Sequence, residues 1–345
     1  MHKVAIVGAA GYAGVELTRL VLAHPELELT MVTSTADAGT RVADLYPALA
    51  GCDLRYVEPD AARVAEAAAV AFLAVPHTAA LAIAPALLDA GLVVIDASAD
   101  FRLRDADVYS AWYATAHTAP ELLGEAAYGL PELWRSTLGG ARLVACPGCY
   151  PTATLLAAAP AIEAGLVISD RVIVDAKSGV SGAGRAPGAG THYSSVNESV
   201  HAYKVAAHRH TPEIAQGLSD LGLAHPRVTF APHLVPMTRG LLSTVYLEVE
   251  PGLGADEALE VYRNRYAGEP FITVHGAGRM PATGEVRGSN RAHIGVTVDE
   301  ASGMLVASCA IDNLVKGTSG QAVQCANLVL GYPETLGLDI PVPVV

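Results

Sequence analysis

Cys149 stands where a thiol can act as a nucleophile. The apolar run from Leu143, expected to be a strand, ends at a Pro-Gly turn, and the run Pro151–Ala159 is expected to be a helix with Pro151 at its first position. Cys149 then lies at the N-terminus of that helix, where backbone N–H groups and the helix dipole favour a thiolate. Most cysteines are buried and inert. This position instead predicts a nucleophile.

A histidine pair, His208 and His210, precedes Thr211-Pro212-Glu213, which is typical of a helix start. Residues two apart on an extended backbone point to one side, so both imidazoles are expected to face the same way. A helix start disfavours a protonated His210, and a neutral imidazole suits proton transfer. No third ligand stands at zinc spacing, and we therefore expect no metal.

The segment from Lys177 to Arg185 combines small residues and hydroxyls with a basic residue at each end. It follows an expected strand, Arg171–Asp175, and we expect a loop whose backbone N–H groups approach an anion closely. We expect Ser181 and Gly182 to contact a cofactor. The residues of this loop expected to contact the substrate are Lys177, Ser178, Gly179 and Arg185.

A β-α-β pattern opens the chain: a strand over Lys3–Val7, a helix over Val15–Leu22 and a strand over Leu27–Thr33. The turn between strand and helix has the spacing G-x-x-G-x-x-G, at which a pyrophosphate can rest on backbone N–H groups. This pattern predicts a dinucleotide site. Its expected contacts are Gly8, Gly11, Tyr12, Ala13 and Gly14.

The end of the second strand distinguishes NADP from NAD. NAD enzymes commonly place an acid there to hold the ribose 2′-hydroxyl. This chain has Ser34 there, with Asp37 several residues later and Arg41 within reach. Hydroxyl groups and an arginine suit a 2′-phosphate, so NADP is the expected cofactor, contacted by Ser34.

Two further apolar runs, Ala69–Val75 and Leu92–Asp96, are expected to be buried parallel strands. Ligands of such sheets bind beyond the carboxyl ends of the strands. Pro76 is therefore expected to contact the cofactor. Arg102 is expected either to hold a phosphate or carboxylate or to pair with a nearby aspartate.

Composition excludes several classes of function. Of the 345 residues 51% are hydrophobic and 17% charged, which is typical of a packed globular protein, and the length suits two domains. A net charge of -13 argues against nucleic acid or an anionic membrane as partner. Five scattered cysteines and an N-terminus without signal-peptide features predict a cytoplasmic protein with a small-molecule substrate.

Later segments have β-type patterns and suggest a mixed, partly antiparallel sheet suited to contacts in a homo-oligomer, a dimer or a tetramer. These segments are Val228–Phe230, Leu242–Glu248, Ile272–His275, His293–Val298 and Leu305–Ile311.

Over its whole length the chain resembles the N-acetyl-gamma-glutamyl-phosphate reductases, enzymes of arginine biosynthesis. The resemblance rests on the glycine turn at Gly8 and on later motifs. These are Asp100-Phe-Arg-Leu103, Tyr128-Gly-Leu-Pro-Glu132, Pro147-Gly-Cys-Tyr-Pro-Thr152, Ser178-Gly-Val-Ser-Gly-Ala-Gly-Arg185, His208-Arg-His-Thr-Pro-Glu213 and Asp312-Asn-Leu-Val-Lys-Gly317. Thr35 departs from the pattern, because relatives often have a basic residue after the position of Ser34.

This resemblance implies an α/β fold: a Rossmann-type NADP-binding domain, residues 1–148 and 316–345, and an α+β catalytic and oligomerisation domain, residues 149–315, of the glyceraldehyde-3-phosphate dehydrogenase-like kind. It implies a Cys149 nucleophile, acid/base work by His208 or His210, and Asn313 and Gly317 near the nicotinamide. Arg209 joins the candidates that hold the substrate.

The implied reaction is NADPH-dependent reduction of N-acetyl-L-glutamyl 5-phosphate to the semialdehyde through a thioacyl enzyme. Reductases of aspartyl phosphate or of a carrier-linked aminoadipyl phosphate are alternatives, and so is a non-catalytic NADP-binding sensor. The His-Arg-His segment argues against the aspartyl enzyme.

Overall fold

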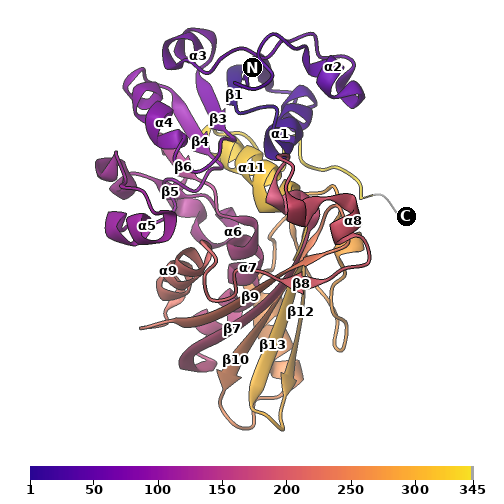
Figure 1. Ribbon diagram of the computed structural model, residues 1–345. Helices are drawn as coiled ribbons and strands as arrows, with labels where there is room; N and C mark the ends of the chain where they lie inside the picture. Colours follow the sequence, from indigo (N-terminus) through magenta and orange to yellow (C-terminus); the bar gives the residue numbers. More distant parts are fainter. Residues whose placement is uncertain (343–345) are drawn as a thin grey trace. The chain divides into compact units, whose positions relative to one another are not determined.

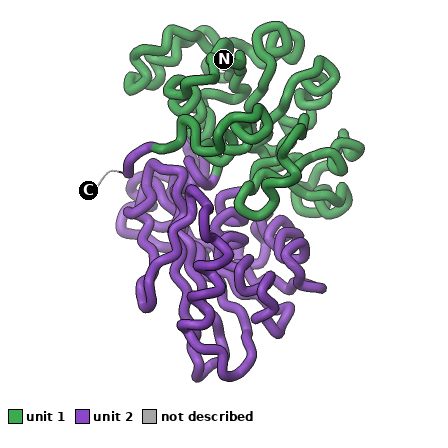
Figure 2. The backbone as a smooth tube through the Cα atoms, turned by 180° about the vertical axis from the view of Figure 1, so that it is seen from behind, with its two compact units in different colours: residues 1–147, 318–339 green, residues 148–317, 340–345 purple. Residues whose placement is uncertain are grey.

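The computed structural model describes residues 1–342 and divides into two compact units (Figure 2). Unit 1 comprises Met1–Pro147 and Thr318–Asp339, and unit 2 comprises Gly148–Gly317 with the chain from Ile340 onward. Residues 343–345, which we assigned to the nucleotide-binding domain, lie outside the described residues.

Unit 1 contains a six-stranded parallel sheet with the strand order β2-β1-β3-β4-β6-β5 (Figure 1). The predicted parallel strands are confirmed, although β3 is shorter than expected and ends before Ala74. β3 is buried at every position, as a strand covered on both faces must be. The strands are β1 (His2–Val7), β2 (Leu27–Thr33), β3 (Val70–Leu73), β4 (Val93–Asp96), β5 (Ala127–Tyr128) and β6 (Leu143–Ala145).

The last helix of unit 1 returns to the glycine turn from the far end of the chain. Figure 1 shows α11 beside α1, and the Ser319 hydroxyl donates to the Ala13 carbonyl at 2.8 Å. None of the helices in residues 1–342 is long and apolar enough to cross a membrane. The helices of unit 1 are α1 (Tyr12–Leu22), α2 (Val42–Leu45), α3 (Ala61–Ala67), α4 (Ala80–Asp89), α5 (Ala106–Tyr113), α6 (Pro131–Trp134) and α11 (Gly320–Val329).

Unit 2 contains a seven-stranded mixed sheet with the order β11-β12-β13-β10-β7-β9-β8 (Figure 1). The pairs β7–β9 and β11–β12 are parallel and the other pairs are antiparallel, which confirms the predicted mixed sheet. The strands are β7 (Val167–Gly179), β8 (His201–Ala202), β9 (Arg227–Val235), β10 (Leu241–Val249), β11 (Ile272–Val274), β12 (Ala292–Asp299) and β13 (Met304–Ile311).

Helices α7, α9 and α10 pack against one face of this sheet. β10 shows the resulting alternation: Ser243 and Val245 are buried towards the helices, while Thr244 and Tyr246 on the other face are half-buried. The helices of unit 2 are α7 (Cys149–Glu163), α8 (Tyr193–Val196), α9 (Thr211–Leu221) and α10 (Ala255–Arg265).

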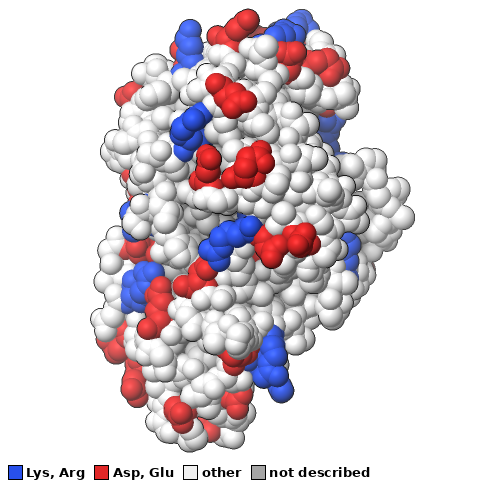
Figure 3. All heavy atoms as spheres, turned by 90° about the vertical axis from the view of Figure 1, so that its left-hand side faces the viewer, with Lys and Arg blue, Asp and Glu red and all other residues white. Residues whose placement is uncertain are grey.

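Single turns of 3-10 helix complete the two units. They are Pro47–Leu49, Pro120–Gly124 and Arg135–Thr137 in unit 1, and Val180–Ala183, Ala189–Thr191 and Thr283–Glu285 in unit 2. On the face shown in Figure 3, acidic and basic side chains are interspersed. That pattern suits an acidic protein whose anionic ligand must be met locally.

Candidate active site

Cys149 is the first residue of α7, with Gly148 at the N-cap. Pro151 is therefore the third residue of the helix, and the prediction that it is the first was wrong. Its missing N–H still costs little, because the first four N–H groups of a helix have no partner within the helix. Cys149 is half-buried, whereas the other four cysteines are buried.

Glu213 fixes the turn that presents the thiol. It lies in the first turn of α9, is 1% exposed, and accepts the Gly148 N–H through Oε1 at 2.9 Å. A buried N–H needs such an acceptor, so Glu213 holds the N-cap of α7 in place.

Gly317 packs directly against Cys149. A Cβ placed on Gly317 would lie 2.7 Å from the Cys149 Cβ, closer than two carbon atoms can approach. Gly317 belongs to a π-helical turn, Val315–Ser319, and its N–H donates to the Asp312 carbonyl at 2.9 Å. The absence of a side chain at Gly317 gives the thiol its space.

The imidazoles of His208 and His210 lie side by side, with centroids 4.8 Å apart. The expected extended backbone was wrong: the segment is a turn, and His210 has φ -79° and ψ -10°. Tyr150, which follows the thiol, contacts both rings edge-on, at 5.5 and 5.9 Å. Its hydroxyl lies 3.0 Å from that of Tyr203. The histidines and the start of α7 therefore form one cluster.

His208 is neutral at physiological pH. Burial, assisted by the charges of Lys204 and Arg209, lowers its pKa to about 4. Its Nδ1 accepts the His210 backbone N–H at 3.1 Å, so the proton of the neutral ring resides on Nε2.

The segment from Lys177 to Arg185 is not one loop. Lys177, Ser178 and Gly179 end strand β7, and a 3-10 turn follows over Val180–Ala183. The strand continues because its residues pair with β10 and β9 on both sides. Lys177 forms an ion pair with Asp175 at 2.7 Å, and Arg185 lies on an exposed stretch.

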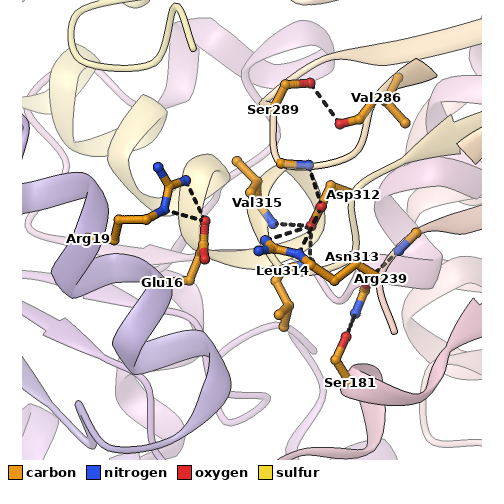
Figure 4. A network of polar contacts seen from close by, with 12 residues as sticks. Glu16, Arg19, Ser181, Arg239, Val286, Ser289, Asp312, Asn313, Leu314 and Val315 are labelled. Atoms are coloured by element: carbon orange, nitrogen blue, oxygen red, sulfur yellow. Dashed lines mark hydrogen bonds and ion pairs between the residues drawn. The ribbon is translucent and has the colours of Figure 1, made fainter. Parts of the chain in front are cut away.

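Ser181 and Asn313, 132 positions apart in the chain, are hydrogen-bonded (Figure 4). The Asn313 amide donates to the Ser181 hydroxyl at 2.9 Å, and its carbonyl accepts the Gly240 N–H at 2.8 Å. A Cβ on Gly182 would lie 3.0 Å from the Ser178 hydroxyl. Ser181, Gly182 and Asn313, which were all predicted to contact the cofactor, thus lie together in one polar cluster.

An ion pair between half-buried Arg239 and buried Asp312 lies beside this cluster (Figure 4). The guanidinium of Arg239 approaches both oxygens of Asp312, with Nε–Oδ2 at 3.0 Å and Nη2–Oδ1 at 3.1 Å. The Asp312 carboxylate also accepts the N–H groups of Leu314 and Val315. Asp312 therefore anchors the turn that leads to Gly317.

The glycine turn of unit 1 has the backbone that a dinucleotide site needs. Gly8 has φ +85°, and a Cβ there would lie 2.5 Å from the Ala74 carbonyl oxygen. A Cβ on Gly14 would clash with the Gly8 carbonyl oxygen, so the start of α1 packs closely on the turn that follows β1. A Cβ on Gly11, the N-cap of α1, would meet nothing closer than 3.7 Å. Packing thus requires Gly8 and Gly14 and leaves open space at Gly11 for a ligand.

Buried carboxylates hold the loops beyond β3 and β4. Asp100 accepts the N–H groups of Thr78 and Ala80, at 2.7 and 3.0 Å, and the hydroxyl of Tyr109. This fixes the loop that begins at Pro76. Burial raises the pKa of Asp96 to about 7, and Asp96 accepts both the N–H and the hydroxyl of Ser98.

Arg102 is 7% exposed and donates to the carbonyls of Cys146 and Ala97, at 2.7 and 3.0 Å. The alternative of an aspartate partner receives no support from Asp105, whose carboxylate caps α5. Arg102 thus fixes the backbone at Cys146, three residues before Cys149.

Ser34 exchanges hydrogen bonds with Asp37: its hydroxyl donates to the carboxylate at 3.0 Å and accepts the backbone N–H at 3.2 Å. Thr33, which ends β2, accepts the Gly8 N–H through its hydroxyl at 3.2 Å. The Asp37 carboxylate is therefore hydrogen-bonded to Ser34 within this turn.

Comparisons with known proteins agree with this arrangement. Residues 3–141 match the semialdehyde dehydrogenase NAD binding domain, and residues 149–313 match the semialdehyde dehydrogenase dimerisation domain. An N-acetyl-gamma-glutamyl-phosphate reductase from Symbiobacterium thermophilum is 50% identical over 340 residues, 97% of each chain. One from Magnetococcus marinus is 49% identical over 338 residues, 98% of this chain and 97% of that one.

The chain belongs to the N-acetyl-gamma-glutamyl-phosphate reductase family. It is an oxidoreductase with an NAD(P)-binding domain. Aspartate semialdehyde dehydrogenase II from Vibrio cholerae has the same fold: the TM-score is 0.72 at 18% identity, covering 96% of this chain and 98% of that one. The enzyme from Candida albicans, solved with NADP, has a TM-score of 0.69 at 15% identity, covering 95% and 98%. These structures confirm the predicted fold class.

Four further residues of the candidate site were not predicted from the sequence. Tyr150 and Glu213 stand inside the quoted motifs, and a glutamate in the first turn of an expected helix is the signal that would have marked Glu213. Tyr203 and Arg239 have no local signal, because each acts through a partner distant in the chain: Tyr150 is 53 positions away and Asp312 is 73.

Proposed function

We propose that this chain reduces N-acetyl-L-glutamyl 5-phosphate to N-acetyl-L-glutamate 5-semialdehyde and phosphate with NADPH, a step of arginine biosynthesis. The observation that carries the proposal is the placement of Cys149. It is the half-buried cysteine, it begins α7, Gly317 lies against it, and the next residue, Tyr150, contacts both histidines. The names of relatives about 50% identical over nearly the whole chain support the substrate.

In the first half-reaction the Cys149 thiolate attacks the carbonyl carbon of the acyl phosphate. Backbone N–H groups in the first turn of α7 stabilise the oxyanion of the tetrahedral intermediate. Collapse of this intermediate expels phosphate and leaves a thioester on Cys149. Glu213 keeps the turn in this geometry through the Gly148 N–H.

In the second half-reaction bound NADPH supplies the hydride that converts the thioester into a thiohemiacetal. We assign the acid/base role to His210, which holds a proton at the new alkoxide and takes it back as the aldehyde leaves and the thiolate re-forms. His208 is the poorer candidate, because a pKa of about 4 makes its imidazole a weak base that is not protonated at neutral pH. It positions His210 through the Nδ1 hydrogen bond.

Basic residues would hold the phosphate and carboxylate of the substrate. The candidates are Arg102, Lys177, Arg185 and Arg209. Arg209 stands between the two histidines in the chain, and its charge contributes to the lowered pKa of His208. Charge–charge contacts of this kind match an anionic substrate in an acidic protein.

NADP is the proposed cofactor. Arg41 and Arg55 form an antiparallel backbone bridge. Val57, two residues after Arg55, forms a parallel bridge with Thr33, and its carbonyl accepts the Ser34 N–H at 3.0 Å. These backbone contacts bring the segments that carry Arg41 and Arg55 to the end of β2, and guanidinium groups suit a 2′-phosphate. We expect Arg41→Ala to weaken NADP binding and to leave NAD binding unchanged, as titration with each dinucleotide would measure.

The open face of the unit 2 sheet is the proposed homo-oligomer contact, giving a dimer or tetramer. It carries Ile173, 39% exposed, opposite Tyr246 on the neighbouring strand. The match of residues 149–313 to a dimerisation domain supports a contact between copies of this unit. Light scattering of Tyr246→Glu should show smaller particles than the wild type. The cytoplasm stays the predicted location.

The reverse reaction tests the proposal. Protein, NADP, inorganic phosphate and N-acetylglutamate semialdehyde should give phosphate-dependent NADPH formation, which Cys149→Ala abolishes and Cys146→Ala retains. Turnover only with aspartate semialdehyde, or with carrier-linked aminoadipate semialdehyde, would keep the mechanism and refute the substrate. If folded protein that binds NADP turned over none of the three semialdehydes, the result would favour a non-catalytic NADP-binding sensor.

A further inference from the structure

A second cluster of reactive side chains lies in unit 2, apart from the cysteine motif in the chain. It consists of His275, Glu285 and His293. The Glu285 Oε2 lies 3.0 Å from the His275 Nε2 and 3.2 Å from the His293 Nδ1. The three atoms lie within 4.8 Å of one another, and the two rings are nearly perpendicular, 85° apart.

The fold holds these side chains firmly. His275 directly follows β11, is 6% exposed, and donates its backbone N–H to the Ile294 carbonyl of β12 at 2.8 Å. His293 lies within β12. The segment that joins the two strands packs closely on β12, since a Cβ on Gly295 would lie 2.6 Å from the Arg279 carbonyl oxygen. Three residues separated by ten and eight positions are thereby brought to one point.

Two imidazole nitrogens and a carboxylate oxygen form a ligand set that proteins use for zinc. In a tetrahedral zinc site with bonds of about 2.0–2.1 Å, neighbouring ligand atoms are about 3.3 Å apart. The two nitrogen–oxygen distances observed, 3.0 and 3.2 Å, are close to that spacing. Arg279 binds the other oxygen of Glu285 at 2.8 Å, which leaves Oε2 directed at the imidazoles.

We propose that His275, Glu285 and His293 bind one divalent transition-metal ion, Zn²⁺ above all, with water as the fourth ligand. We expected no metal from the sequence, because no third ligand stands at zinc spacing beside His208 and His210. The site requires neither the cysteine nor the proposed reaction.

The ion would stabilise a segment that is hydrogen-bonded to Asp312. After Glu285 the chain turns through Val286–Asn290, where the Gly288 N–H donates to the Asp312 carboxylate at 2.7 Å. Asp312 in turn pairs with Arg239. A bound ion therefore stabilises the segment from which Asp312 receives this hydrogen bond, and it should raise the melting temperature.

The test uses full-length protein freed of metal with a chelator and alkylated at its accessible thiol, so that Cys149 cannot act as a ligand. Zn²⁺ titrated by calorimetry should bind at one equivalent per chain. Co²⁺ should produce the visible absorption of a tetrahedral nitrogen–oxygen site. His293→Gln and Glu285→Gln should each weaken binding at least about 100-fold, since even loss of outer-shell partners costs 10- to 100-fold.

His225→Gln is the matched control, because His225 is an exposed histidine of the same unit. It should bind Zn²⁺ as the wild type does. Absence of stoichiometric binding in the alkylated protein would overturn the proposal. So would binding that His293→Gln leaves intact while circular dichroism shows that variant to be folded.

Discussion

Gly317→Ala should disable the nucleophile without removing it. The added Cβ would lie 2.7 Å from the Cys149 Cβ and 3.3 Å from both the Cys149 Cα and the Asp312 carbonyl oxygen. Ordinary contact between carbon atoms begins at about 3.5 Å, so the start of α7 or the π-helical turn must move by about 1 Å. Neither is the end of a flexible side chain, and the displacement therefore falls on the backbone that presents the thiol.

A misplacement of about 1 Å at a reacting group costs about 100-fold in rate. Extra volume in a packed region costs about 1–3 kcal/mol of unfolding free energy. We expect kcat to fall about 100-fold while the variant stays folded.

Two assays separate this effect from lost cofactor binding. Alkylation of Cys149 in the dinucleotide-free protein, followed by mass spectrometry, reports on the thiol alone and should become slower. The reverse reaction with saturating NADP reports on kcat. Gly139→Ala is the control, because a Cβ there meets nothing within 4 Å and its φ is not positive.

The reasoning would be refuted by one pattern of results. If Gly317→Ala kept a kcat within threefold of the wild type and an unchanged alkylation rate, Gly317 would not give Cys149 its space. A fall in kcat with unchanged alkylation would instead place the effect on the cofactor.

Three further outcomes follow from the same structure. Glu213→Ala should lower the unfolding free energy measured in denaturant by about 1–3 kcal/mol, because the buried Gly148 N–H loses its acceptor; Glu213→Gln, whose amide oxygen can accept, should restore most of it. The unfolding free energy should decrease by at most about 3 kcal/mol as the pH falls from 6.5 to 4. The reason is that His208 of the unfolded chain is protonated near pH 6.5, whereas His208 of the native protein is protonated only near its pKa of about 4. His208→Gln should flatten this pH dependence and His225→Gln should not. Gly11→Ala should leave the melting temperature unchanged, since its Cβ would meet nothing closer than 3.7 Å, yet raise the dissociation constant for NADPH measured by fluorescence.

Much of the fold was predictable because its signals are local. The apolar run Lys3–Val7, the glycine spacing after it and the helical pattern to Leu22 depend only on neighbouring residues, and β1, the turn and α1 agree with them. Predictions failed where tertiary pairing overrides local composition. Lys177–Gly179 has the composition of a loop, yet it extends β7 because β10 and β9 supply backbone partners on both sides.

The sequence by itself determined the chemistry available to this protein. A cysteine between a Pro-Gly turn and a helix, two histidines beside a helix start and a glycine turn after a strand are each defined within about ten residues. Only the tertiary structure decided how these groups divide the work. His208 became the neutral neighbour of His210 through its burial, Gly317 came to lie against Cys149 across 168 positions, and His275, Glu285 and His293 met on two paired strands. Burial and long-range contact set pKa values and free space, and neither is encoded by residues adjacent in the chain.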